Sequence, residues 1–191
     1  MTLTRKLTVA ELQRTLDTLD AGVLKTGAHT DEDGAFCVLE VVNKTRRPND
    51  ACTDARFGLP DIRPLNDAPW SSDVARTGPM LAVAAALSDF PQWSAQRQQR
   101  FAEHLTIAIV RQIIADLPGL PDVMRQRCRE VSTVHEAGAA ARAAAWAAAG
   151  AAARAAWAAA EAAAPNTVDS LLIHACEIFI DAATASDSDE G

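Results

Sequence analysis

The sequence is poor in the side chains that build large hydrophobic cores. Of its 191 residues, 41 are Leu, Ile, Val or Phe, whereas another 41 are alanine. That share of strong core formers, about a fifth, lies near the level at which disorder is expected. Burial must therefore come from closely packed helices with small residues at their interfaces, because alanine costs no side-chain entropy on ordering. Since alanine is also the best helix former and strand formers are few, the sequence predicts an all-α helical bundle.

Common metal, redox and nucleotide motifs are missing. The four cysteines, Cys37, Cys52, Cys128 and Cys176, lie far apart and form no Cys-x-x-Cys pair. This spacing argues against a zinc ribbon and against a disulfide-rich secreted scaffold. The sequence also contains no glycine-rich phosphate loop and no nucleophile elbow built around a serine. No cofactor can therefore be named from the sequence.

Positive charge is in short supply. The chain has 18 Lys and Arg residues against 25 Asp and Glu residues, which gives a net charge of −7. This balance disfavours nucleic acid as a partner, because phosphate binding depends on clustered Lys and Arg. The first twelve residues lack the apolar run of a secretory signal, and charged residues interrupt the one stretch long enough to cross a bilayer. We therefore expect a soluble, cytoplasmic protein that does not bind membranes.

Alanine dominates one stretch, Ala137 to Ala164, where it fills 21 of 28 positions. The larger residues follow at intervals of three or four, so they share one side of a helix. Two Arg–Trp pairs lie within it, each about one helical turn apart and positioned for cation–π contact. We call these four residues the alanine-rich ridge: Arg142, Trp146, Arg154 and Trp157.

Two interpretations of the alanine-rich ridge remain open. Tryptophan and arginine are enriched in the residues that dominate protein interfaces. The ridge therefore predicts binding to a protein partner or assembly into a homo-oligomer. Alternatively, the tryptophans fill gaps inside the protein's own fold.

Capping and periodicity predict helices on both sides of this stretch. Thr8 and Glu11 form a capping-box pattern, Thr30 precedes an acidic first turn, and Ser94 precedes a long apolar row. Four prolines between residues 46 and 78 indicate a long irregular loop. The expected helices span about 8–20, 30–42, 79–87, 94–117, 122–164 and 167–183, the fifth being one long helix or two with a kink near Ser132–Thr133.

These elements suggest a division of the chain into three parts. Residues 1–120 are expected to form a helical core domain that includes the irregular loop 46–78. Residues 121–184 are expected to form the long alanine-rich helix and a C-terminal helix, which packs on the core or on a partner. Residues 185–191 are expected to be a disordered acidic tail.

One segment gathers residues that could perform chemistry. His29, Asp33, Cys37 and Glu40 supply an imidazole, two carboxylates and a thiol within twelve residues. If the last three are helical, their spacing of four and three places them on one face. A thiolate near a helix N-terminus could act as a nucleophile with a histidine base, and the same set could bind a metal ion. Equally, Cys37 could be a small buried apolar residue and Glu40 a solvated one.

Three functions from different classes follow. The leading one is a helical protein that mediates self-association or binding to another protein, without catalysis. The second is a thiol- or metal-dependent enzyme centred on His29, Asp33, Cys37 and Glu40. The third, suggested by the charge of −7 and the acidic tail, is an inhibitor that mimics nucleic acid.

Short blocks of the sequence form a recognisable combination with the alanine-rich stretch. They are Gly27-x-His29, Glu32-Asp33-Gly34, Cys37-Val38-Leu39-Glu40, Pro69-Trp70-Ser71-Ser72-Asp73 and Pro79-Met80-Leu81. This combination resembles a set of uncharacterised proteins from high-GC bacteria and their phages, whose members also tend to carry an Ala- and Trp-rich C-terminal region. The resemblance implies a family neighbourhood but no activity, cofactor or mechanism.

Overall fold

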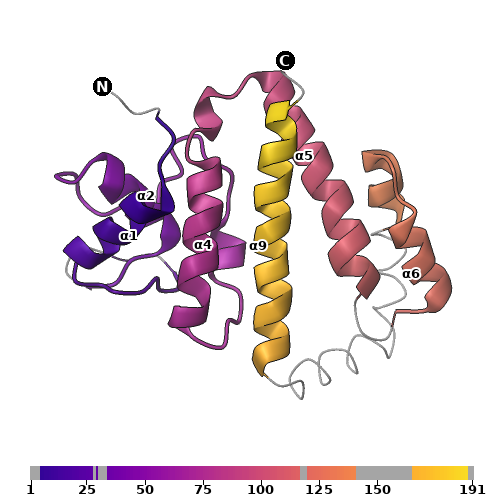
Figure 1. Cartoon of the computed structure of the whole chain (residues 1–191), viewed down its shortest axis with the longest axis horizontal. Helices are drawn as coiled ribbons and strands as arrows, with labels where there is room; N and C mark the ends of the chain where they lie inside the picture. Colours follow the sequence, from indigo (N-terminus) through magenta and orange to yellow (C-terminus); the bar gives the residue numbers. More distant parts are fainter. Residues whose placement is uncertain (1–4, 28, 30–33, 117–119, 141–164, 189–191) are drawn as a thin grey trace.

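The protein is an all-α helical bundle (Figure 1). The computed structural model describes residues 5–27, 29, 34–116, 120–140 and 165–188. Every regular element in these ranges is a helix, which confirms the predicted fold class. None of the helices in the described ranges combines the length and apolar character that a membrane span requires.

The first helix, α1 (Val9–Thr18), begins where its capping box predicts. The Glu11 carboxylate accepts a hydrogen bond from the Thr8 N–H at 2.9 Å, and the Thr8 hydroxyl accepts one from the Glu11 N–H at 3.3 Å. Leu12 and Leu16 lie on one face of α1 and are fully buried. The capping signal and the apolar spacing therefore specify this helix correctly.

The second helix, α2 (Val38–Arg46), starts later than the sequence predicts. Thr30 lies outside the described residues, but Gly34 has a φ of +59° and the segment up to Cys37 is not helical. The Phe36 carbonyl accepts a hydrogen bond from Lys25 N–H at 2.9 Å, so this segment pairs with an earlier loop. This hydrogen bond holds residue 36 outside a helix, and α2 begins only after it. Cys37 precedes the helix and is not part of it.

The expected irregular loop 46–78 is shorter than predicted. A short helix, α3 (Arg63–Asn66), lies within it, and α4 (Asp73–Leu87) begins six residues before the predicted position 79. The Ser72 hydroxyl caps α4 by accepting a hydrogen bond from Ala75 N–H at 3.1 Å. Pro79 therefore sits inside α4, where proline costs one backbone hydrogen bond, and buried neighbours such as Met80 and Leu81 outweigh that loss.

The fifth helix, α5 (Ala95–Ala108), begins at the predicted cap, where the Ser94 hydroxyl accepts a hydrogen bond from Arg97 N–H at 3.1 Å. It continues without a break into a wider π-helical turn, η3 (Ile109–Ile113), and a short 3₁₀ turn, η4 (Ile114–Asp116). A 3₁₀ turn, η2 (Phe90–Gln92), connects α4 to α5. The predicted span of 94–117 is therefore confirmed as far as Asp116.

The first part of the predicted span 122–164 consists of two helices separated near Ser132–Thr133, which is the second of the two expected arrangements. The helix α6 (Asp122–Arg129) ends, and a new helical segment starts at residue 134 and is described up to residue 140. The Glu136 carboxylate accepts hydrogen bonds from the backbone N–H groups of Ser132 at 2.9 Å and Thr133 at 3.1 Å. These bonds cap the new helix and explain why the chain turns at this point. The rest of the alanine-rich stretch, residues 141–164, lies outside the described residues.

The last helix, α9 (Pro165–Ser188), is longer than the predicted span 167–183 and takes in part of the expected disordered tail. Ser186 is fully buried, and its carbonyl accepts a hydrogen bond from the Arg100 side chain at 3.3 Å. The Asp187 carboxylate lies 2.8 Å from the Arg97 guanidinium. Two arginines of α5 therefore bind the C-terminal end of α9, so the predicted disorder is wrong for residues 185–188.

Two apolar clusters hold the bundle together. The larger cluster joins α1, α2, α4, α5 and α9, and its aromatic centre is formed by Phe90, Trp93, Phe101 and Phe179. The smaller cluster joins η3, η4 and α6 to the helical segment at residues 134–140. The C-terminal helix therefore packs on the core domain of its own chain, which is one of the two expected arrangements.

We expect Phe101→Ala to lower the free energy of unfolding by about 3 to 5 kcal/mol, because it empties the aromatic centre shared by α5 and α9. Urea denaturation of the full chain measures the loss. Val123→Ala on α6, where the side chain is 75% exposed, is the control and should cost about 0.5 kcal/mol or less. Equal losses in the two variants would contradict this description of the core.

Candidate functional site

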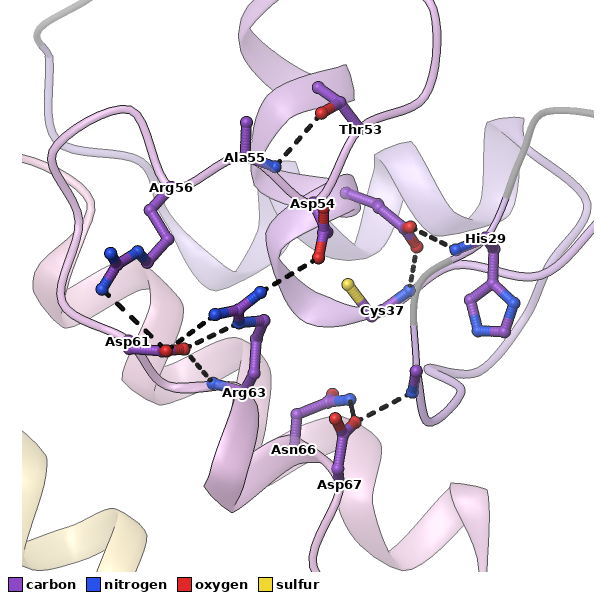
Figure 2. A network of polar contacts seen from close by, with 12 residues as sticks. His29, Cys37, Thr53, Asp54, Ala55, Arg56, Asp61, Arg63, Asn66 and Asp67 are labelled. Carbon is purple, nitrogen blue, oxygen red and sulfur yellow. Dashed lines mark hydrogen bonds and ion pairs between the residues drawn. The ribbon is translucent and has the colours of Figure 1, made fainter.

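Glu40 brings the ends of the candidate segment together. Its side chain is fully buried, and one carboxylate oxygen accepts a hydrogen bond from the His29 backbone N–H at 2.6 Å. The other oxygen accepts one from the Cys37 backbone N–H at 2.5 Å (Figure 2). Asp33 lies outside the described residues. The structure therefore collects His29, Cys37 and Glu40 in one network, but it does so through backbone groups.

The Glu40 carboxylate has a structural task in this arrangement. It stands at the third position of α2 and satisfies the N–H of the residue that precedes the helix, as in a capping box. It also fixes the loop at His29 against the start of α2. The part of the chain that the structure describes contains no group of three or more His, Cys, Asp or Glu residues able to hold a metal ion. Glu40 therefore positions backbone groups. The alternative in which Glu40 is solvated is wrong, because its side chain is fully buried.

Cys37 is placed as a buried apolar residue. Its side chain is 1% exposed, and burial raises the pKa of the thiol to about 12. The nearby Glu40 carboxylate also raises the pKa, whereas backbone N–H groups at the start of α2 lower it by a smaller amount. The loss of hydration therefore dominates over the helix terminus. At neutral pH this cysteine is a thiol, which is a weak nucleophile.

His29 does not form a pair with Cys37. Figure 2 shows the imidazole and the sulfur pointing away from each other, and no hydrogen bond between the two side chains is found. The His29 side chain is half-buried, and its Nε2 atom is buried without a hydrogen-bond partner among the described residues. The geometry needed for a histidine base to activate a thiol is therefore not formed here.

An ion-pair network lies next to this segment (Figure 2). The Arg63 guanidinium binds both carboxylate oxygens of Asp61 at 2.8 Å, and it contacts Asp54 at 3.2 Å. Arg56 lies 3.9 Å from Asp61 on another side. Hydrogen bonds from Arg63 are the largest cause of the lowered pKa of Asp61, about 2. These pairs connect the irregular segment after α2 to the start of α3.

The same region encloses a shallow hollow of about 350 Å³, which we call the Asp61 hollow. It is lined by Gly27, Asp54, Asp61, Arg63, Pro64 and Asp67. The Asp67 carboxylate accepts a hydrogen bond from the Gly27 N–H at 2.9 Å, at a residue whose φ is +81°. The charged groups of the hollow therefore already bind one another or the backbone. These hydrogen bonds and ion pairs fix the loops around the hollow relative to one another.

Asn66 is a buried polar residue that the sequence pattern did not single out. It is fully buried, and its amide donates hydrogen bonds to the Lys25 carbonyl at 2.9 Å and to Asp67 at 2.7 Å. It therefore ties α3 to the loop before His29. Its position between two prolines and a loop gives no periodic signal, so the sequence alone could not identify it.

The residues of the alanine-rich ridge, Arg142, Trp146, Arg154 and Trp157, lie outside the described residues. The chain on both sides of them is described. The helical segment before them contributes Ala137 and Ala140 to the smaller apolar cluster, and α9 follows at Pro165.

Comparisons with protein-family models, with curated protein sequences and with solved structures find no match to this chain. The resemblance to the high-GC bacterial and phage proteins stays a prediction. Any function must therefore be argued from the geometry of this molecule.

We expect the four thiols to react at very different rates with a disulfide reagent at pH 8. Cys52 is half-buried, whereas Cys37, Cys128 and Cys176 are buried and burial raises the pKa of each. One thiol should therefore react quickly, and Cys52→Ser should remove that fast phase. A fast phase that survives in Cys52→Ser and disappears in Cys37→Ser would show that Cys37 is an activated thiol.

We expect Glu40→Ala to lower the free energy of unfolding by about 2 to 4 kcal/mol, because it leaves the buried N–H groups of His29 and Cys37 without an acceptor. Glu40→Gln should also be destabilising, since an amide offers one acceptor where the carboxylate offers two. Glu177→Ala removes a side chain that is 62% exposed and serves as the control. Urea denaturation distinguishes the three, and a Glu40→Ala variant as stable as the control would contradict the structural task of Glu40.

Proposed function

We propose that this protein acts by protein–protein association, with a second copy of itself as the first partner to test, and that it catalyses no reaction. One observation carries the proposal. Apolar residues along one side of α9 become more exposed toward the N-terminal end of the helix, which is the end that follows the alanine-rich ridge. Leu171, Ala175, Ile178 and Ala182, spaced four, three and four residues apart, share this side.

The exposure of these four residues is graded along the helix. Ile178 and Ala182 are 2% and 4% exposed, Ala175 is half-buried, and Leu171 is 39% exposed. Figure 1 shows α5 and α9 meeting near the C-terminal end of α9 and separating toward its N-terminal end. The apolar side of α9 therefore continues past the point where its own bundle covers it. Ile173, also 39% exposed, lies two residues from Leu171 and therefore on the opposite side of the helix, outside this apolar side.

The position of this area in the chain supports the proposal. The first turns of α9 follow directly after the stretch that contains the alanine-rich ridge. Both are rich in apolar side chains, and the ridge adds the Trp and Arg residues that are frequent in interface hot spots. We propose that the ridge and the first turns of α9 contribute to one association surface.

The candidate catalytic residues favour this function over an enzyme. Glu40 is occupied by two backbone hydrogen bonds, and the raised pKa of Cys37 keeps its thiol protonated. The described residues also offer no metal-binding cluster. Mimicry of nucleic acid is less favoured, because Asp187 at the acidic end of α9 is paired with Arg97.

We expect the full chain to assemble as its concentration rises, and we expect Leu171→Ser to shift assembly to at least tenfold higher concentration. Trp146→Ala plus Trp157→Ala should act in the same direction, since tryptophan truncation removes about 2 kcal/mol or more at a hot spot. Sedimentation analysis over a range of concentrations measures the assembly.

Val9→Ser on α1 is the matched control, because Val9 is 43% exposed and lies on a different helix. It should leave assembly unchanged. Circular dichroism confirms that each variant keeps its helices. Assembly that responds equally to Val9→Ser and to the α9 variant would contradict an association surface at the first turns of α9.

A further inference from the structure

A second hollow lies between α5 and α6, on the side of the molecule that the candidate segment does not reach. It encloses about 590 Å³, and we call it the Arg111 hollow. It is lined by His104, Ile107, Ala108, Arg111, Gln112 and Arg129. The residues come from α5, from the π-helical turn η3 and from the last turn of α6, so three elements contribute to it.

The polar side chains of this hollow differ from those of the Asp61 hollow in one respect. The charged groups of the Asp61 hollow bind one another, as described above. In contrast, the side chains of His104, Arg111 and Gln112 form no hydrogen bond or ion pair with any residue in the described ranges. Arg129 lies 2.8 Å from the Asp116 carboxylate. Among the described residues, Arg111 is therefore the cation of this hollow that has no side-chain partner.

The π-helical turn gives the hollow part of its lining. The Ile114 N–H reaches the carbonyl of Ile109, five residues earlier, in addition to that of Val110. This wider turn inserts an extra residue into the helix, and such turns are frequent at functional sites. Arg111 and Gln112 lie within the turn, and both line the hollow together with His104 from the preceding turn of α5.

The chemistry of the lining selects a class of ligand. Ile107 and Ala108 supply an apolar wall, whereas two guanidinium groups from separate elements supply donors and positive charge. Guanidinium groups match the geometry of phosphate and carboxylate oxygens, and charge-assisted hydrogen bonds of this kind are the stronger ones. Gln112 adds an amide donor and His104 adds an imidazole.

We propose that the Arg111 hollow binds an oxyanion, a phosphate or carboxylate group, carried on a small apolar body. Arg111 is the principal charged contact of the oxyanion, and Arg129 shares its guanidinium between the ligand and Asp116. The apolar body lies against Ile107 and Ala108. This site is separate from the association surface on α9, so either proposal can fail without the other.

Calorimetric titration of the full chain with phenyl phosphate and with benzoate tests the proposal, with benzyl alcohol as the uncharged probe. We expect at least one anion to bind, and we expect benzyl alcohol to bind at least tenfold more weakly. Tighter binding of phenyl phosphate assigns the site to a phosphate, and tighter binding of benzoate assigns it to a carboxylate. No binding of either anion at millimolar concentration would overturn the proposal.

Variants locate the site. Arg111→Gln removes an exposed cation without breaking a contact of the described fold, and it should weaken anion binding at least tenfold. Arg14→Gln removes an exposed cation from α1 and should leave binding unchanged. Arg129→Gln should weaken binding less, because Arg129 is already shared with Asp116. Binding that is equally strong in Arg111→Gln and in the unmodified chain would overturn the proposal, provided that circular dichroism shows both to be folded.

Discussion

The packing of α9 across α4 and α5 is the interaction on which the rest of the structure depends. The last helix of the chain supplies Phe179 to the aromatic centre and Cys176 to the contact with Met80, so the N-terminal core is completed only by C-terminal residues. Arg97 stacks over Trp93 at 3.9 Å and also pairs with Asp187. The C-terminal half of α9 is therefore the part that the bundle holds most firmly.

The fold class and several helix starts could be predicted because they depend on local chemistry. Thr8 and Ser94 cap the helices that their side chains predict. The errors arose where distant contacts decide the conformation, as with the pairing of Phe36 with Lys25 that delays α2. The spacing predicts a helix that starts at Pro79, although burial of its neighbours keeps Pro79 inside α4. The break near Ser132–Thr133 is one of the two arrangements that the sequence predicts, and the hydrogen bonds between Thr133 and Glu136 cap the helix that follows it.

At the candidate site, the spacing of residues in the sequence does not predict what their side chains do. His29, Cys37 and Glu40 lie close together in the structure, although Cys37 precedes α2 and does not share a helical face with Glu40, and spacing cannot tell backbone hydrogen bonds from side-chain chemistry. Burial decides that question, because a desolvated thiol keeps its proton and a carboxylate bound to two N–H groups is fully used. Asn66 and the Arg111 hollow depend on how distant segments meet, and no periodic pattern reveals such meetings.

The protein is a bundle whose polar clusters mostly stabilise loops and whose apolar surface is incompletely covered at the start of α9. We propose that this surface and the alanine-rich ridge associate with a second copy of the chain. Native mass spectrometry of the purified full-length protein tests that claim most directly, since one spectrum reports subunit number and any retained metal ion. The account predicts an oligomer without bound metal. A monomer that carries a stoichiometric metal ion would contradict it and would return attention to His29 and Cys37.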